Sequence, residues 1–139
     1  MNIDTARFNM IEQQIRPWNV LDASVLELLS VVKREDFVPA AHKGLAFADL
    51  EIPLMGSGED AMRLGQCMLE PRLEARLLQD LAVQSHETVL EIGTGSGYQA
   101  AVLAEIVKDV YTIEIIPKLA KNAKRLLADL GYTNIHCKT

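Results

Sequence analysis

The sequence predicts an α/β domain of the Rossmann-like type, truncated after its third strand and preceded by a helical subdomain. Short apolar strands are expected at 89–92 and 110–114, and a third begins at 134–137. Helical patterns of 10–15 residues separate them, which indicates parallel pairing through right-handed crossovers. A glycine-rich turn follows the first strand directly, as in folds that bring backbone close to a nucleotide-like ligand.

The N-terminal part predicts helices followed by a long loop. We expect Asp4 to cap a first helix and Asp22 a second, because each precedes a stretch with apolar residues on one face. Residues 39–65 show no clear period and are rich in Gly, Pro and Ala, which indicates loop with one short strand at about 50–54. We therefore expect an N-terminal subdomain of helices and loop over 1–71 and a partial Rossmann-like cofactor-binding domain over 72–139.

Proline and glycine mark the ends of the later helices. Proline suits the first turn of a helix, so helices are expected to begin at Pro71 and at Pro117. Between the first two strands a helix is expected over about 98–107. Gly131 stands where the last helix needs a left-handed C-terminal residue.

Composition excludes several classes of function. The net charge of −5 disfavours nucleic acid or an anionic membrane as the main partner. No apolar run is long enough for a transmembrane helix, and the N-terminus does not read as a signal peptide. Cys67 and Cys137 lie far apart and the three histidines are scattered, so we expect a cytoplasmic protein without a metal site.

The turn after the first strand has glycine at every second position: Gly93, Gly95 and Gly97, with Thr94 and Ser96 between them. Glycine reaches backbone conformations closed to other residues and carries no Cβ that would hold a ligand away. The following helix points its N-terminal N–H groups at the same place, where a carboxylate or phosphate is favoured.

Two acids flank this turn. Glu91 precedes the first glycine by two residues, and Glu114 lies at the end of the second strand, where a carboxylate can accept both hydroxyls of a ribose. The spacing G-x-G-x-G differs from the dinucleotide pattern G-x-G-x-x-G and fits S-adenosylmethionine better. A dinucleotide, or a glycine turn that serves only the strand–helix junction, remains as an alternative.

Residues 89–104, VLEIGTGSGYQAAVLA, carry a specific family pattern. REDFVP at 34–39, AFAD at 46–49, and Gly65-Gln66 followed by Pro71 support it. Together they resemble the protein-L-isoaspartate O-methyltransferases, which are S-adenosylmethionine-dependent enzymes of Rossmann-like fold. The resemblance extends over nearly the whole chain.

The resemblance implies methyl transfer from S-adenosylmethionine to a protein or peptide carboxylate, a reaction of protein repair. It assigns the cofactor to a set of matching positions and places Gln66 at the border of the pocket. These cofactor positions are Glu91, Gly93, Thr94, Gly95, Ser96, Gly97 and Glu114.

The chain departs from the family pattern at three points, one of which is an apparent insertion of several residues at 57–64, in the loop that leads to Leu69. Leu69 stands where the family has its active-site serine, and a leucine side chain cannot form a hydrogen bond, so no catalytic residue is assigned. The chain also stops where the family continues with Gly-Asp-Gly and further strands. We expect this 139-residue form to be inactive, and a cofactor-binding or interaction module without turnover is the alternative function.

In the complete family fold the sheet order is 3-2-1-4-5-7-6, of which this chain has only strands 3-2-1. Strand 89–92 therefore becomes an edge, and alternate residues of 89–92 and 110–114 should be exposed on the face that the missing half would cover, unless residues 1–33 fold over it. An unpaired edge beside a bare apolar face favours association, so we expect a homo-oligomer.

Overall fold

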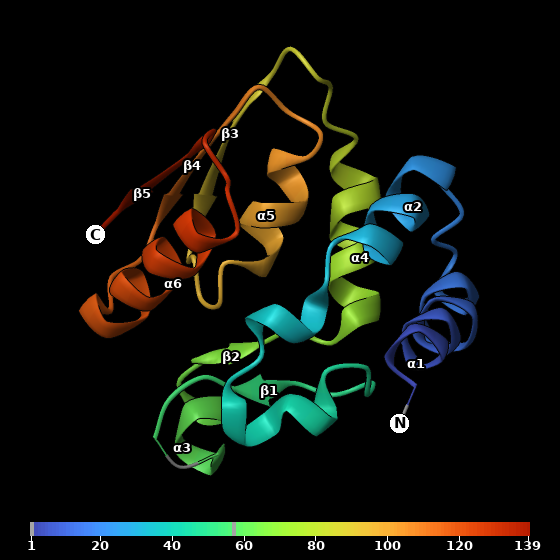
Figure 1. Cartoon of the computed structure of the whole chain (residues 1–139), viewed down its shortest axis with the longest axis horizontal. Helices are drawn as coiled ribbons and strands as arrows, with labels where there is room; N and C mark the ends of the chain where they lie inside the picture. Colours follow the sequence, from blue (N-terminus) through green and yellow to red (C-terminus); the bar gives the residue numbers. More distant parts are fainter. Residues whose placement is uncertain (1, 57) are drawn as a thin grey trace. The chain divides into compact units, whose positions relative to one another are not determined.

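The computed structural model describes residues 2–56 and 58–139. These residues divide into two compact units, an N-terminal unit that ends at Ala82 and a C-terminal unit over Val83–Thr139 (Figure 1). The boundary follows helix α4 (Pro71–Leu81), whereas the sequence analysis placed it before that helix. Hydrogen bonds explain the difference. Gln79 of α4 accepts from the N–H groups of Leu21 (2.8 Å) and Asp22 (3.0 Å) and donates to the Asn19 carbonyl (2.9 Å), so α4 is bound to the N-terminal helices.

The N-terminal unit consists of helices, short helical turns and one small antiparallel ladder between β1 and β2. In chain order its elements are α1 (Ile3–Met10), η1 (Ile11–Ile15), η2 (Arg16–Trp18), α2 (Ala23–Val31), η3 (Arg34–Phe37), η4 (Ala40–Leu45), β1 (Ile52–Pro53), α3 (Gly58–Arg63), β2 (Cys67–Met68) and α4.

The helix starts follow the capping rules, with one correction. Asp22 caps α2 as expected, because its side chain accepts from the backbone of the first turn. The first helix begins earlier than predicted: Asn2 Oδ1 accepts from Thr5 N–H at 3.0 Å, while Asp4 forms an ion pair with Arg7 at 3.0 Å. The described part of 39–65 holds η4, β1 and α3, which are too short to leave a periodic pattern.

A buried ion pair ties the parts of this unit together. The Arg34 guanidinium, 1% exposed, pairs with Glu74 of α4. It also donates to the carbonyls of Ala46 (2.9 Å) and Leu69 (2.8 Å). Burial raises the pKa of Glu74, and the Arg34 charge opposes that shift. One cation therefore satisfies groups from three separate segments of the chain.

The C-terminal unit is a three-stranded parallel sheet in the order β3-β4-β5, with α5 and α6 on one face (Figure 1). Its elements are β3 (Thr88–Ile92), α5 (Tyr98–Ala104), β4 (Asp109–Ile113), α6 (Pro117–Asp129) and β5 (Ile135–Lys138). The predicted strand order is confirmed. Helix α5 ends at Ala104, three residues earlier than expected, and Gly131 has the expected positive φ of 88°.

The two faces of the sheet differ as the alternation of β-strand side chains requires. Val110 and Thr112 of β4 are fully buried on the side of the helices. On the other side Leu90 is 61% and Ile92 74% exposed, and Tyr111 stacks on His136 with ring centroids 4.5 Å apart. The expected exposure of the second face and of the β3 edge is confirmed.

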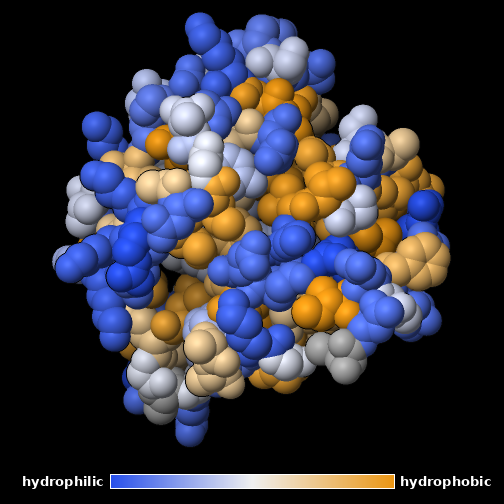
Figure 2. All heavy atoms as spheres, viewed as in Figure 1, coloured by the Kyte–Doolittle hydropathy of each residue, from blue (hydrophilic) through white to orange (hydrophobic). Residues whose placement is uncertain are grey.

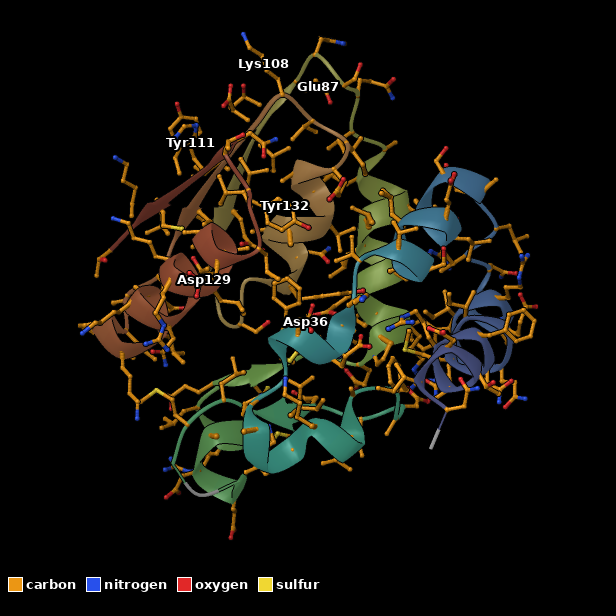
Figure 3. The ribbon with its side chains drawn as sticks, in the orientation of Figure 1. Asp36, Glu87, Lys108, Tyr111, Asp129 and Tyr132 are labelled. Carbon is orange, nitrogen blue, oxygen red and sulfur yellow. The ribbon has the colours of Figure 1, made fainter. Side chains whose placement is uncertain are left out.

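Two charged residues lie at the edge of the sheet opposite the glycine loop. Glu87 and Lys108 lie together at the amino-terminal ends of β3 and β4 (Figure 3), where the Lys108 N–H donates to the Glu87 carbonyl at 3.1 Å.

In the view of Figure 2 the outer side of α6 is largely hydrophilic. This is expected for an amphipathic helix, because its other face carries the buried residues Leu119, Ala123 and Leu127.

The ion pair of Arg34 and Glu74 predicts a large stability difference between two substitutions in the same helix. Glu74→Gln leaves a buried cation without its counter-charge, so we expect the free energy of unfolding to fall by about 3 kcal/mol. Asp80→Asn removes the partner of an exposed Arg76 pair (3.1 Å) and should change it by less than about 1 kcal/mol. Urea denaturation measures both, and equal losses would contradict a structural role for the buried pair.

Candidate functional site

The carboxyl ends of β3 and β4 meet at one edge of the sheet, and the glycine loop 93–97 lies there. The N–H groups of Gly93 and Thr94 both donate to the carbonyl of Ile113, at 2.7 and 3.2 Å. Gly93 and Gly97 have φ values of 96° and 91°, which side chains disfavour. A Cβ at Gly97 would also contact Leu127 at 3.4 Å, whereas at Gly93 it would meet open space. The loop therefore needs glycine for its backbone conformation, and the space beside Gly93, at its start, is open.

Glu114 follows β4 and reaches the loop with its side chain. Its Oε1 accepts from Gly95 N–H at 2.8 Å and its Oε2 from Ile116 N–H at 3.1 Å. A carboxylate offers about four acceptor positions, so two remain for hydroxyl groups of a ligand. The side chain is 6% exposed, so its position is set by these two amides and not by solvent.

Glu91 and Thr94 meet at a residue that the sequence analysis did not select. Thr112, fully buried in β4, places its Oγ1 2.6 Å from Glu91 Oε1 and 2.6 Å from Thr94 Oγ1. Register explains the contact, because Glu91 and Thr112 are direct partners in the parallel ladder. Strand alternation also puts Thr112 on the same face as Glu114, two residues later. This spacing in the sequence could have identified Thr112 as a candidate residue of the site.

Ser96 has a local role in this structure. Its Oγ accepts from the Tyr98 N–H at 3.2 Å at the start of α5. Helix α5 has seven residues, so its dipole adds less to anion binding than the longer predicted helix would. The structure thus brings together all seven cofactor positions predicted from the sequence, held by β3, β4 and the loop between β3 and α5.

Gln66 and Leu69 belong to the N-terminal unit. The Gln66 backbone bridges α3 and β1, donating to Ala61 (2.7 Å) and accepting from Leu54 (2.9 Å). Its place at the border of the cofactor pocket stays a prediction. The Leu69 carbonyl accepts from Arg34 Nη2 at 2.8 Å, so the buried guanidinium fixes the backbone at this position.

Cys67 is unsuited to act as a nucleophile. Its Sγ donates to Glu51 Oε2 at 2.8 Å. Burial, reinforced by the Glu51 carboxylate, raises the pKa of the Cys67 thiol to about 12. The thiol therefore stays protonated at neutral pH, where only a thiolate would be reactive.

The described part of the chain, residues 2–56 and 58–139, has neither a metal-binding cluster nor a membrane-spanning helix. Within it, no group of three or more His, Cys, Asp or Glu side chains is placed to hold a metal ion. None of the helices in that part has the length and apolar character needed to cross a membrane.

The parallel sheet with a glycine loop after its first strand is the fold of Rossmann-like, S-adenosylmethionine-dependent methyltransferases. One solved protein-L-isoaspartate O-methyltransferase matches 98% of this chain, over 41% of its own length, with a TM-score of 0.71 and 22% identity. A Plasmodium falciparum protein-L-isoaspartate O-methyltransferase, solved in complex with S-adenosyl-L-homocysteine, matches the whole chain over 62% of its own length, with a TM-score of 0.71 and 15% identity.

The sequence comparisons define the family. The model of the protein-L-isoaspartate(D-aspartate) O-methyltransferase family matches residues 6–139. The Gloeobacter violaceus protein-L-isoaspartate O-methyltransferase is 40% identical over 94% of this chain and 60% of its own length. Protein-L-isoaspartate O-methyltransferase 2 of Syntrophobacter fumaroxidans is 44% identical over 86% of this chain and 45% of its own length. The chain belongs to the protein-L-isoaspartate(D-aspartate) O-methyltransferase family, and it spans about half the length of these curated relatives.

Proposed function

We propose that the chain provides the S-adenosylmethionine-binding part of a protein carboxyl O-methyltransferase that acts on isoaspartyl residues. The observation that carries this proposal is the approach of Glu114 to the glycine loop, with its Oε1 2.8 Å from the Gly95 amide. This contact puts an acceptor for ribose hydroxyls beside bare backbone, which is the combination that an adenosyl ligand needs. Family membership and the relatives' names support the same reaction.

The residues present fit this ligand. Glu114 would hold the ribose through its two remaining acceptor positions, and the loop 93–97 would lie against the methionine portion with no side chain at its three glycines. Bound S-adenosylmethionine supplies an activated methyl group. The protein's part is then to orient the acceptor oxygen, because proximity and alignment lower the barrier to a displacement.

Leu69 is compatible with this chemistry. A carboxylate acceptor has a pKa of about 4 and is ionised at neutral pH, so no general base is needed to prepare it. A serine at this position would serve orientation and not proton transfer. Its replacement by leucine therefore bears on how the acceptor is held, because the leucine side chain has no hydrogen to donate to a carboxylate.

A protein acceptor and a cytoplasmic location belong to the same proposal. The chain has a net charge of −5, and nucleic acid is also negatively charged, so charge repulsion favours a protein over a nucleic acid as the methyl acceptor. Both cysteines, Cys67 and Cys137, are free thiols, as is usual in a reducing compartment.

Cofactor binding is tested by calorimetry with S-adenosylhomocysteine. Wild type should bind, and Glu114→Ala should bind roughly 10- to 100-fold more weakly, the scale of one or two hydrogen bonds to a charged acceptor. Glu87→Ala is the matched control, because Glu87 lies at the opposite end of β3 and should leave the affinity unchanged. Equal affinities for wild type and Glu114→Ala would refute the ribose assignment, and no binding by wild type would refute the proposed function.

The reaction is tested by transfer of labelled methyl from S-adenosylmethionine to an isoaspartyl peptide, with the aspartyl peptide as control. We expect incorporation only into the isoaspartyl peptide. It should occur in a chain extended by the remaining C-terminal part of the Gloeobacter relative and be absent from the 139-residue chain. Binding of S-adenosylhomocysteine without transfer by either form would favour a binding module without turnover.

We also propose that the 139-residue chain associates with a second copy through the uncovered sheet face. On that face β3 presents Leu90 and Ile92, which are 61% and 74% exposed, so the unpaired edge carries apolar surface, next to the charged Asp109 and Lys138 of β4 and β5. Sedimentation at tens of micromolar should show dimers or larger species, and Leu90→Lys should shift the protein to monomer. A stable, well-folded wild-type monomer under these conditions would rule the association out.

A further inference from the structure

The hydroxyl of Thr112 is the most enclosed polar group at the cofactor site. Thr112 lies in the central strand, fully buried, with oxygen–oxygen distances of 2.6 Å to both Glu91 and Thr94. Distances of 2.5–2.7 Å are typical of hydroxyl-to-carboxylate bonds, which are roughly twice as strong as neutral ones. The Thr112 hydroxyl has one carboxylate partner and one hydroxyl partner, and these two contacts fix its orientation.

The direction of this hydrogen-bond chain follows from which groups can donate a hydrogen and which can only accept one. An ionised carboxylate only accepts, so the Thr112 hydroxyl must give its one hydrogen to Glu91. Thr112 then has only lone pairs left for Thr94, so the Thr94 hydroxyl must be the donor. The chain therefore runs from Thr94 through Thr112 to Glu91, and the Glu91 charge orients a side chain inside the glycine loop.

Three consecutive residues of the strand region 112–114 hold three consecutive residues of the loop. The Thr112 hydroxyl holds Thr94, the Ile113 carbonyl holds the N–H groups of Gly93 and Thr94, and the Glu114 carboxylate holds the N–H of Gly95. The last two contacts belong to the site already described. The first is made through a residue that cannot itself reach a ligand, because it is fully buried.

We propose that Thr112 is a positioning residue of the cofactor site, which sets the glycine loop by coupling Thr94 to the Glu91 carboxylate. The inference rests on the proposed function, since it concerns how the glycine loop of the same site is fixed before the ligand binds. A loop fixed before binding loses less conformational entropy when the ligand arrives, so loss of the hydroxyl should appear as weaker binding.

Ionisable groups near Thr112 come from several elements packed against β4, and in α5, which also packs there, the ionisable residue is the buried Tyr98. Glu91 lies on β3, Glu114 follows β4, Cys137 faces Thr112 from β5, and Lys124 comes from α6. Burial raises the pKa of Cys137, with Lys124 opposing and Glu91 adding to the shift. Removing the Thr112 hydrogen takes one donor from Glu91, which should raise the pKa of that carboxyl. In Thr112→Val, binding of S-adenosylhomocysteine should then begin to weaken at a higher pH than in wild type.

The test compares Thr112→Val, which keeps the shape but removes the hydroxyl, with Thr112→Ser, which keeps the hydroxyl. Calorimetry with S-adenosylhomocysteine at several pH values should show about tenfold weaker binding for Thr112→Val and a higher acid midpoint. Thr112→Ser should stay within about threefold of wild type. Val110→Ala, on the same strand and face, is the packing control: it should lower the unfolding temperature but change neither the affinity nor the acid midpoint.

The outcomes separate the possibilities. Equal affinity and acid midpoint for Thr112→Val and wild type would overturn the inference, as would Thr112→Ser binding as weakly as Thr112→Val. If Thr112→Val does not fold, Thr94→Val removes the donor end of the chain, and wild-type binding by that variant would overturn it. If wild type itself binds no S-adenosylhomocysteine, the proposed function fails, which is a distinct result from failure of the Thr112 assignment.

Discussion

The glycine loop depends on its attachment to the neighbouring strand. Parallel pairing of β3 with β4 brings the ends of both strands to one edge, and residues 112–114 then fix the loop through a hydroxyl, a carbonyl and a carboxylate. A shift of the register by one residue would turn Thr112 and Glu114 to the opposite face. The register is set by burial, because Val110 and Thr112 lie under the helices while Leu90 and Ile92 face outward.

The same geometry explains what this chain keeps and what it lacks relative to its family. The groups that would contact the cofactor lie in one unit and are held mainly by backbone and short side chains. The position of the family's serine, Leu69, lies in the other unit, where the buried Arg34–Glu74 pair fixes its carbonyl. Under the proposed function, carboxylate methylation needs orientation more than proton transfer, so the residue at position 69 would bear on substrate placement and the glycine-loop unit on cofactor binding.

Regular patterns made much of the fold predictable. The alternation of apolar strands with helices predicted the parallel order, and Pro71, Pro117, Asp22 and Gly131 marked helix ends, as observed. Local chemistry decides these features, since a proline or a capping carboxylate acts within one turn. Over 39–65 the elements are only a few residues long, so their placement comes from packing and leaves no periodic signal. The cap at Asn2 in place of Asp4 shows that neighbouring polar residues can compete for one role.

The sequence by itself determined the family, the glycine loop and the two acids beside it, because their types and spacings are local and specific. Only the tertiary structure decided that Thr112 joins Glu91 to Thr94, that Gln79 binds α4 to the N-terminal helices, and that Arg34 holds Leu69. These contacts join residues separated by 18 to 58 positions. They are set by strand register and by the burial of charge, which arise only when distant segments share one core.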